Sequence, residues 1–256
     1  MRARGLAVML AAALLLAGGP AVGRVAAAEG AGTERDPLEG FNRKIFWFND
    51  KLDVYILVPV ATGWEKVSPR CVRTSVSNFF WNLRFPIVTI NDLLQGKLKD
   101  GASDVGRFAV NTTVGVLGFF DPASRWGLER HVEDFGQTLG VWGVPPGPYL
   151  VLPLLGPSNP RDAAGFAVDY VLAVTPFFID EYILVAARAV DVVNERSFVL
   201  KQVEDAKASA FDYYVFVRNA YLQRRRALVL DLADTGAEEG EDLYHPEFDT
   251  DTEVKP

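Results

Sequence analysis

Cysteine and histidine are almost missing from this chain of 256 residues. Cys71 is the only cysteine, and His131 and His245 are the only histidines. A single cysteine excludes an intramolecular disulfide and a metal site built from several thiolates. His131 with Glu133 and Asp134 is a weak metal candidate, because one histidine beside acids on a surface turn is far more often a solvated patch. We therefore expect no metal site and no cofactor.

The motifs of common enzymes and nucleotide-binding proteins are also absent. The sequence holds no G-x-S-x-G nucleophile motif, no phosphate-binding loop and no dinucleotide fingerprint. His131 is the only histidine outside the acidic C-terminal region, so a hydrolase would have one candidate base. We predict that the chain is not an enzyme and has no catalytic residues. A phospholipase that uses His131 is the competing hypothesis.

A surplus of basic residues is missing as well. The net charge is −7, but residues 231–256 alone hold ten acids and one lysine, whereas the first 230 residues hold 25 basic and 23 acidic side chains. The body is therefore nearly neutral, and no basic stripe suggests a nucleic-acid partner. The acidic end lacks hydrophobic periodicity, which predicts a disordered tail over residues 235–256.

A long apolar run occurs at the N-terminus. Two arginines precede the apolar residues 5–17, and three consecutive alanines follow at 26–28. This order is typical of a secretory signal, and the run is too short for a membrane span. We predict a cleaved signal peptide over residues 1–28 and a linker over 29–35, with a retained anchor as the alternative. Because no cysteine follows the apolar core, we expect no lipidation there.

A segment in the middle of the chain contains no charged residues. Residues 135–160 carry none, yet they include five glycines and six prolines among many large apolar residues. The prolines exclude one continuous helix and a regular central strand. Irregular, apolar backbone must be packed within protein or line a cavity. We predict that this segment lines a passage around which helices are arranged. A buried connection in an ordinary globular core is the alternative.

The rest of the chain reads mostly as helix, because alternating strand patterns are scarce. Pro59 and Pro69 bracket a break, and Pro86 should end the helix that begins at Pro69. The helix over residues 97–111 should turn Val105, Phe108 and Ala109 inward. Further helices are expected over residues 87–95, 163–175, 178–196 and 208–233. The predicted fold class is all-α.

Two aromatic clusters have two interpretations. Phe41, Ile45 and Phe48 recur at helical spacing, and Phe46 and Trp47 widen the stripe. Phe79, Phe80 and Trp81 are consecutive, and three neighbouring aromatic residues on a helix cannot all face one core. Each cluster could face a globular core, or it could lie in a membrane interface. The membrane-interface candidates are Phe41, Ile45, Phe46, Trp47, Phe48, Phe79, Phe80 and Trp81.

These segments resemble the MlaA family, also called VacJ, of outer-membrane phospholipid-transport lipoproteins. The matching motifs, in order, are DPLEGFNR at 36–43, SNFFWNL at 77–83, NDLLQGK at 91–97, RFAVNTTVGVLGFFDPAS at 107–124, EDFGQTLGVWGVPPGPYLVLPLLGPSNPRD at 133–162 and FVRNAYLQRR at 216–225. The resemblance covers nearly the whole predicted domain of residues 36–234.

The resemblance implies a single ring-like helical domain in the inner leaflet of the outer membrane. In the family the ring encloses a channel, sits beside a trimeric porin and passes mislocalised phospholipid to a periplasmic lipid-binding protein, without a cofactor. Carried onto this chain, the channel candidates are Gln137, Thr138, Trp142, Gly143, Gly147, Tyr149, Leu152, Arg161 and Asp162.

The chain departs from the family pattern at one point. Members typically carry a lipidated cysteine after the signal sequence, whereas Cys71 lies within the domain. We therefore expect an exported, outer-membrane protein without a lipid anchor, held by its apolar helix faces and a partner. The alternative is a soluble periplasmic helical lipid-binding or scaffold protein without a channel.

Overall fold

A computed structural model of the chain describes residues 36–173 and 179–232. The expected signal peptide, the predicted tail over residues 235–256 and the expected helix break at Pro176 lie outside these ranges. The described part is helical apart from one short hairpin, which confirms the all-α class. Its elements are α2 (Glu39–Leu52), η1 (Asp53–Leu57), α3 (Val58–Val67), α4 (Arg70–Gln95), α5 (Leu98–Thr113), α6 (Pro122–Arg125), α7 (Phe135–Val141), β1 (Leu150–Leu152), β2 (Gly156–Ser158), α8 (Pro160–Leu172), α10 (Glu181–Phe198), α11 (Leu200–Ser209) and α12 (Tyr213–Val229).

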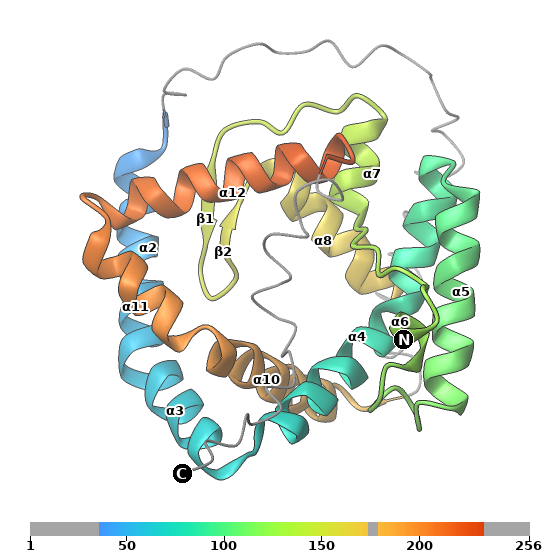
Figure 1. Ribbon diagram of the computed structural model, residues 1–256. Helices are drawn as coiled ribbons and strands as arrows, with labels where there is room; N and C mark the ends of the chain where they lie inside the picture. The colour runs from blue at the N-terminus through green and yellow to red at the C-terminus, as the bar shows by residue number, and fades with distance from the viewer. Residues whose placement is uncertain (1–35, 174–178, 233–256) are drawn as a thin grey trace, which may run out of the picture.

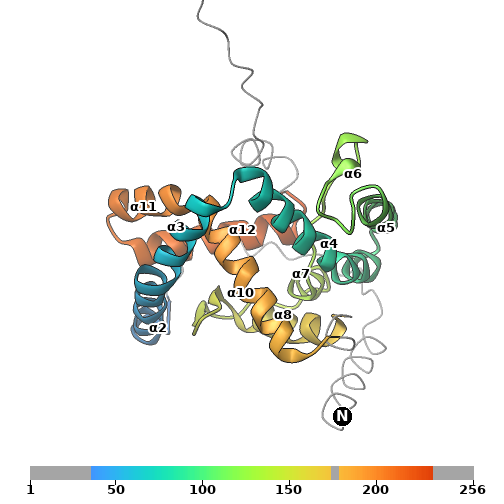
Figure 2. The ribbon, with the colours of Figure 1, turned by 90° about the horizontal axis from the view of Figure 1, so that it is seen from below.

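The helices are arranged as a ring (Figure 1). α2, η1 and α3 form one side, α10 and α4 follow below, α7 and α8 lie opposite, and α12 closes the upper side. α5 packs against α4 on its outer side, as the views in Figures 1 and 2 agree. The hairpin lies within the outline of the ring, where β1 contacts α2 and β2 contacts α12. None of the helices within 36–173 and 179–232 is long and apolar enough to cross a membrane.

Two of the proline predictions are wrong. α4 runs from Arg70 to Gln95 with Pro86 inside it, so residues 69–84 and 87–95 form one helix rather than two. An internal proline costs about 3 kcal/mol, and the packing of α4 against α5 offsets that cost. The expected break between Pro59 and Pro69 is instead α3, with Pro59 in its first turn, where a missing N–H costs little. Gly96, in the left-handed region at φ 82°, ends α4 as expected.

The C-terminal helices also differ from prediction. The expected helix over residues 208–233 is shorter, because α11 ends at Ser209 and α12 begins at Tyr213. Asp212 caps α12 by accepting a hydrogen bond from the backbone N–H of Val215. α11 itself was not predicted as a separate helix. α8 starts at Pro160, three residues early, because the Asn159 side chain caps it by accepting from the N–H of Asp162.

Polar residues fill the interior of the described part and apolar residues cover much of its outside. Eighteen polar or charged residues are buried, against seven hydrophobic ones, although large hydrophobic side chains are exposed on nearly every helix. An ordinary water-soluble domain shows the opposite distribution. Exposed apolar surface on this scale marks contact with a membrane or a partner.

The face of α5 shows this inversion directly. Asp104, Arg107 and Asn111 are buried, whereas Val105 is 47% exposed. Ala109 is exposed as well, and Phe108 is half-buried, stacked on Phe85 at 4.2 Å between ring centroids. The prediction that Val105 and Ala109 face inward is therefore wrong, because the buried face of this helix carries Asp104, Arg107 and Asn111, whose hydrogen bonds and ion pairs add to the stacking of Phe108.

The central stretch contains more regular structure than the sequence predicts. Residues 135–141 form α7, and β1 pairs with β2 in an antiparallel hairpin whose register places Val151 opposite Pro157. Asn42 and Asn49, two helical turns apart on α2, bind the free edge of β1. Asn42 donates to the Tyr149 carbonyl at 2.9 Å and accepts from the Val151 N–H at 2.9 Å.

Asn49 repeats this pairing further along the hairpin, donating to the Leu152 carbonyl and accepting from the Leu154 N–H, both at 2.9 Å. Each amide side chain therefore supplies one donor and one acceptor, as a neighbouring strand would. The two asparagines fix the hairpin against α2 without a third strand.

Replacement of Asn42 by Ala should destabilise the protein by about 3 kcal/mol, because it leaves a buried carbonyl and a buried N–H without partners. Thermal unfolding in detergent micelles, followed by circular dichroism, measures the change. Asn219→Ala, on the exposed face of α12, is the matched control and should stay within about 0.5 kcal/mol of the parent. Equal stabilities for the two variants would contradict the role of Asn42.

Candidate functional site

The start of the central stretch is tied to the last helix by a buried ion network. Arg225 of α12 donates to both carboxylate oxygens of Asp134, at 2.5 and 3.0 Å, and to Asp162 at 2.9 Å. Burial disfavours its charge, yet the two carboxylates hold the pKa of Arg225 above the ordinary value. The pKa of Asp134 is lowered, because this pairing outweighs burial. One guanidinium therefore joins α12, α7 and α8.

Asp162 is the centre of a second set of contacts. It accepts from the Tyr221 hydroxyl at 2.6 Å, from the Asn159 amide at 2.7 Å and from Arg161 Nε at 2.9 Å. With Arg225, four side chains satisfy this one carboxylate. Such full pairing is what makes a buried carboxylate tolerable.

α7 and α8 approach each other so closely that glycine is required at their contact. A Cβ atom on Gly165 would lie 2.3 Å from the backbone nitrogen of Gly136. Backbone atoms cannot move aside as a flexible side chain can, so only glycine fits. This contact brings the cap of α7, Asp134, beside the first turn of α8 and within reach of Arg225.

Most predicted polar channel residues lie inside this packing. Gln137, Thr138 and Arg161 are buried. Gln137 donates to the Val132 carbonyl and Thr138 donates to Asn91. Asp162 is half-buried in the Arg225 network. These four side chains hold the segment in place, and the structure gives each of them a protein partner.

The other channel candidates are divided between core and surface. Tyr149 is buried in a small core cluster with Val151 and Tyr214. Trp142 and Leu152 are half-buried, and the Trp142 indole donates to the Leu94 carbonyl at 3.2 Å. Gly143 and Gly147 are exposed, both in the left-handed region at φ 90° and 74°.

The membrane-interface candidates on α2 occupy different faces. Phe41, Trp47 and Phe48 are exposed, with Trp47 at 62%. Ile45 and Phe46 instead pack, half-buried, against the core cluster of Tyr149, Val151 and Tyr214.

The aromatic residues of α4 are half-buried. Phe79 packs against Phe80 and stacks on Phe119. Trp81 lies between the guanidinium groups of Arg84 and Arg130, each 5.0 Å from its ring centroid. Phe119 and Arg130 were not among the sequence candidates, because they lie far from α4 in the chain and no local pattern connects them to it.

Removing the shared cation should unfold the ring more readily. Arg225→Gln leaves Asp134 and Asp162 facing each other without their counter-charge, so we expect a loss of about 3–5 kcal/mol. Arg224→Gln changes the exposed neighbouring arginine and should cost about 0.5 kcal/mol or less. Thermal unfolding of both variants in detergent micelles tests this. A loss of similar size in both would show that the network contributes little.

A second cluster of titratable side chains lies where α4 meets α5. Asp92 is fully buried, and neither of its carboxylate oxygens has a hydrogen-bond donor in the described ranges. Burial, in the first place, and the like charge of the adjacent Asp104 together raise the pKa of Asp92 to about 8. Two carboxyl groups in contact are stable when one carries a proton. Asp104 also contacts His131 Nδ1 at 3.2 Å.

The acids beside His131 do not meet at one point. Glu133 binds Lys97 at 2.7 Å, Asp134 binds Arg225 and His131 binds Asp104. No group of three His, Cys, Asp or Glu side chains within 36–173 and 179–232 could hold a metal ion. The patch is half-buried and paired, so the expectation of a solvated patch is wrong.

Asp92→Asn should stabilise the protein increasingly as the pH rises. The folded-state pKa of about 8 lies above the ordinary 3.8. At pH values between the two, Asp92 keeps its proton in the folded state but has lost it in the unfolded state, so the stability of the parent falls as the pH rises. Asparagine removes that dependence. The difference in unfolding free energy between variant and parent should grow by up to about 1.4 kcal/mol per pH unit and level off above about pH 8.

Unfolding by denaturant at a series of pH values measures this difference. Asp205→Asn on the exposed face of α11 is the control and should give no pH-dependent difference. A constant offset for Asp92→Asn across the series would mean that Asp92 is ionised throughout.

The comparisons with known proteins agree with this architecture. The family model of the MlaA lipoprotein matches residues 34–228. The chain is 37% identical over 198 residues to the intermembrane phospholipid transport system lipoprotein MlaA of Escherichia coli (strain K12), covering 74% of this chain and 76% of the relative. It is 34% identical to the protein of the same name in Haemophilus influenzae, covering 77% and 80%.

An uncharacterised protein of Rickettsia felis is 37% identical over 195 residues, covering 76% of this chain and 78% of its own. A solved structure, from work on the structural basis for maintenance of bacterial outer membrane lipid asymmetry, superposes with a TM-score of 0.69. It is 34% identical in sequence and covers 77% of this chain and 100% of its own.

The chain thus shares its mainly helical fold with that solved structure. The chain belongs to the MlaA lipoprotein family.

Proposed function

We propose that this chain is the outer-membrane component of a phospholipid transport system. It removes mislocalised phospholipid from the outer leaflet through a channel and hands it to a periplasmic lipid-binding protein, which maintains lipid asymmetry. A trimeric porin beside the ring is part of the proposal. The relatives named as phospholipid transport lipoproteins support the transport role.

The single observation that carries the proposal is the inverted distribution of side chains. Trp47, Tyr55 and Ile56 are more than half exposed on one side of the ring, and Tyr182, Ile183 and Val185 are exposed on α10. The interior is meanwhile a network of buried amides, carboxylates and guanidinium groups. Each Leu or Phe side chain withdrawn from water contributes about 1.5–3 kcal/mol, so a leaflet around the ring would stabilise it strongly.

The exposed apolar side chains also suggest how the protein is held in the membrane. Cys71 lies in the first turn of α4, inside the folded domain, and so cannot be the N-terminal cysteine of a lipoprotein. We propose that apolar helix faces hold the protein in the inner leaflet of the outer membrane without a lipid anchor. A soluble periplasmic lipid-binding protein would leave the same faces in water, which is unfavourable.

A lipid passage needs an apolar wall for the chains and polar groups for the headgroup. We propose that the exposed residues 143–148, with Leu152 and Trp142, form the wall that contacts lipid. The buried candidates Gln137, Thr138 and Arg161 then support this wall from behind. The glycines keep the backbone accessible, because no side chain covers it.

The test uses the native bacterium with its own copy of the gene deleted. Reintroducing the chain should lower the phospholipid in the outer leaflet, measured as the amount open to an added, membrane-impermeant phospholipase. Gly143→Leu should abolish this effect. A Cβ atom there meets nothing within 4 Å, and the left-handed φ costs a non-glycine residue about 1–2 kcal/mol.

Gly63→Leu on α3 is the matched control, because a Cβ atom there also meets nothing within 4 Å. It should restore asymmetry like the parent. Immunoblotting of the outer-membrane fraction confirms equal amounts of each variant. Full activity of a well-folded Gly143→Leu protein would contradict the proposed wall, and failure of the parent chain to restore asymmetry would contradict the function.

A further inference from the structure

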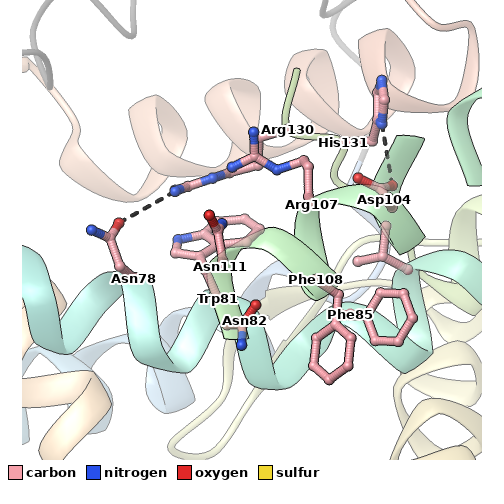
Figure 3. A pocket seen from close by; sticks show the side chains of 11 residues that line it. Asn78, Trp81, Asn82, Phe85, Asp104, Arg107, Phe108, Asn111, Arg130 and His131 are labelled. Carbon is pink, nitrogen blue, oxygen red and sulfur yellow. Dashed lines mark hydrogen bonds and ion pairs between the residues drawn. The ribbon is translucent and has the colours of Figure 1, made fainter. Parts of the chain in front are cut away.

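A small cavity lies outside the ring, between α4, α5 and the connection that follows α6 (Figure 3). Its volume is about 40 Å³, and its polar lining includes Asn78, Trp81, Asp104, Arg107, Arg130 and His131, with Asn82 and Asn111 beside them. One water needs roughly 10–15 Å³ measured in this way. The cavity therefore has room for about three water-sized groups, which is close to the size of one phosphate group.

Two guanidinium groups at this cavity share a single carboxylate. Arg107 donates to Asp121 Oδ2 at 2.8 Å, and Arg130 donates to the same oxygen at 2.9 Å. Asp121 is already saturated, because it also accepts from Asn111 and from both the N–H and the hydroxyl of Ser124. One positive charge is therefore left without a counter-charge from Asp121.

The other carboxylate in the lining does not supply that counter-charge. Asp104 pairs instead with His131 at 3.2 Å, and this hydrogen bond is the chief cause that raises the pKa of His131. The dashed line between His131 and Asp104 in Figure 3 marks the side of the cavity where this pair lies. The surplus charge thus stays with Arg107 and Arg130.

Arg130 is held in place by neighbours that leave donors available. Its guanidinium carbon lies 5.0 Å from the centroid of Trp81, and Nη2 donates to the side-chain oxygen Oδ1 of Asn78 at 3.3 Å. Within the described ranges, Arg130 Nη1 and Nε and the Asn78 amide nitrogen have no hydrogen-bond partner. Unpaired guanidinium and amide N–H groups beside a surplus positive charge are the donors that bind phosphate oxygens.

We propose that this cavity binds a phosphate group, with Arg130 as the main charged donor and Asn78 as a second donor. Because α5 packs on the outer side of α4, the site lies apart from the interior of the ring. Phosphate could come from a phospholipid headgroup or from free phosphate in the periplasm. The headgroup source rests on the proposed function, whereas binding of the phosphate group does not.

Isothermal titration calorimetry on the purified full-length chain in a zwitterion-free, non-ionic detergent tests the site. The probes are inorganic phosphate and glycerophosphoethanolamine, which carries a phosphodiester without acyl chains. Saturable binding of at least one probe is expected, and Arg130→Gln should weaken it by about tenfold or more. Arg125→Gln removes a nearby exposed arginine that does not line the cavity, and it should leave binding unchanged.

Asn78→Asp separates binding from folding. The new carboxylate keeps the acceptor for Arg130, so the fold should be retained, but it neutralises the surplus charge and repels an anion. Thermal unfolding should stay at or above that of the parent while binding is lost. Retained binding in this folded variant would overturn the proposal.

The two probes distinguish the sources. Binding of the phosphodiester in preference to phosphate assigns the site to lipid headgroups, and the reverse preference assigns it to free phosphate. Binding of neither probe overturns the proposal, as does an equal loss in Arg125→Gln and Arg130→Gln, which would indicate general surface attraction. None of these outcomes depends on lipid asymmetry in cells, so they test the phosphate site independently of the transport role.

Discussion

The guanidinium group of Arg225, shared by Asp134 and Asp162, is the interaction on which the ring depends. It comes from the last helix and reaches Asp134, the cap of α7, and Asp162 in the first turn of α8. The contact of Gly136 with Gly165 brings these two carboxylates together, and no side chain fits between the two glycines. Without the cation, two carboxylates would face each other in a half-buried space. The arrangement therefore forms as a unit or not at all.

Further ion pairs close the ring at other points. Arg43 of α2 binds Asp212 at the cap of α12, and Arg196 of α10 binds Asp53 of η1, each through short N–O contacts of 2.7 and 2.8 Å. These pairs connect residues more than 140 positions apart. A ring with little apolar core needs such links, because its helices cannot be held together by hydrophobic burial alone.

The sequence predicts the helical class and the segments that have little charge. It does not predict the direction in which each helix turns its faces. Val105 and Ala109 were expected inside on the rule that apolar residues are buried, and that rule assumes water as the only surrounding solvent. Where a bilayer is the solvent, Asp104 and Arg107 belong inside and Val105 outside.

The long-range pairs were beyond prediction for a different reason. Arg225 stands in a run of three arginines that looks like a solvated patch, and only the fold shows that the middle one points inward while Arg224 and Arg226 are exposed. Likewise, Asn42 and Asn49 mark the polar side of a helix, but their amides find their partners in a hairpin about 100 positions away. The prediction that Pro86 ends a helix was wrong, because the packing of α4 on α5 outweighs the local cost of the proline.

The central claim is that a bilayer leaflet surrounds the apolar exterior of the ring. Quenching of single tryptophans by brominated phospholipids tests it directly. Two variants of the full chain are reconstituted, each retaining one tryptophan: Trp47 on the exposed face of α2, or the half-buried Trp64 of α3, whose indole donates to the side-chain oxygen of the buried Asn194. The account predicts strong quenching of Trp47 and weak quenching of Trp64. Equal or weaker quenching of Trp47 would contradict it.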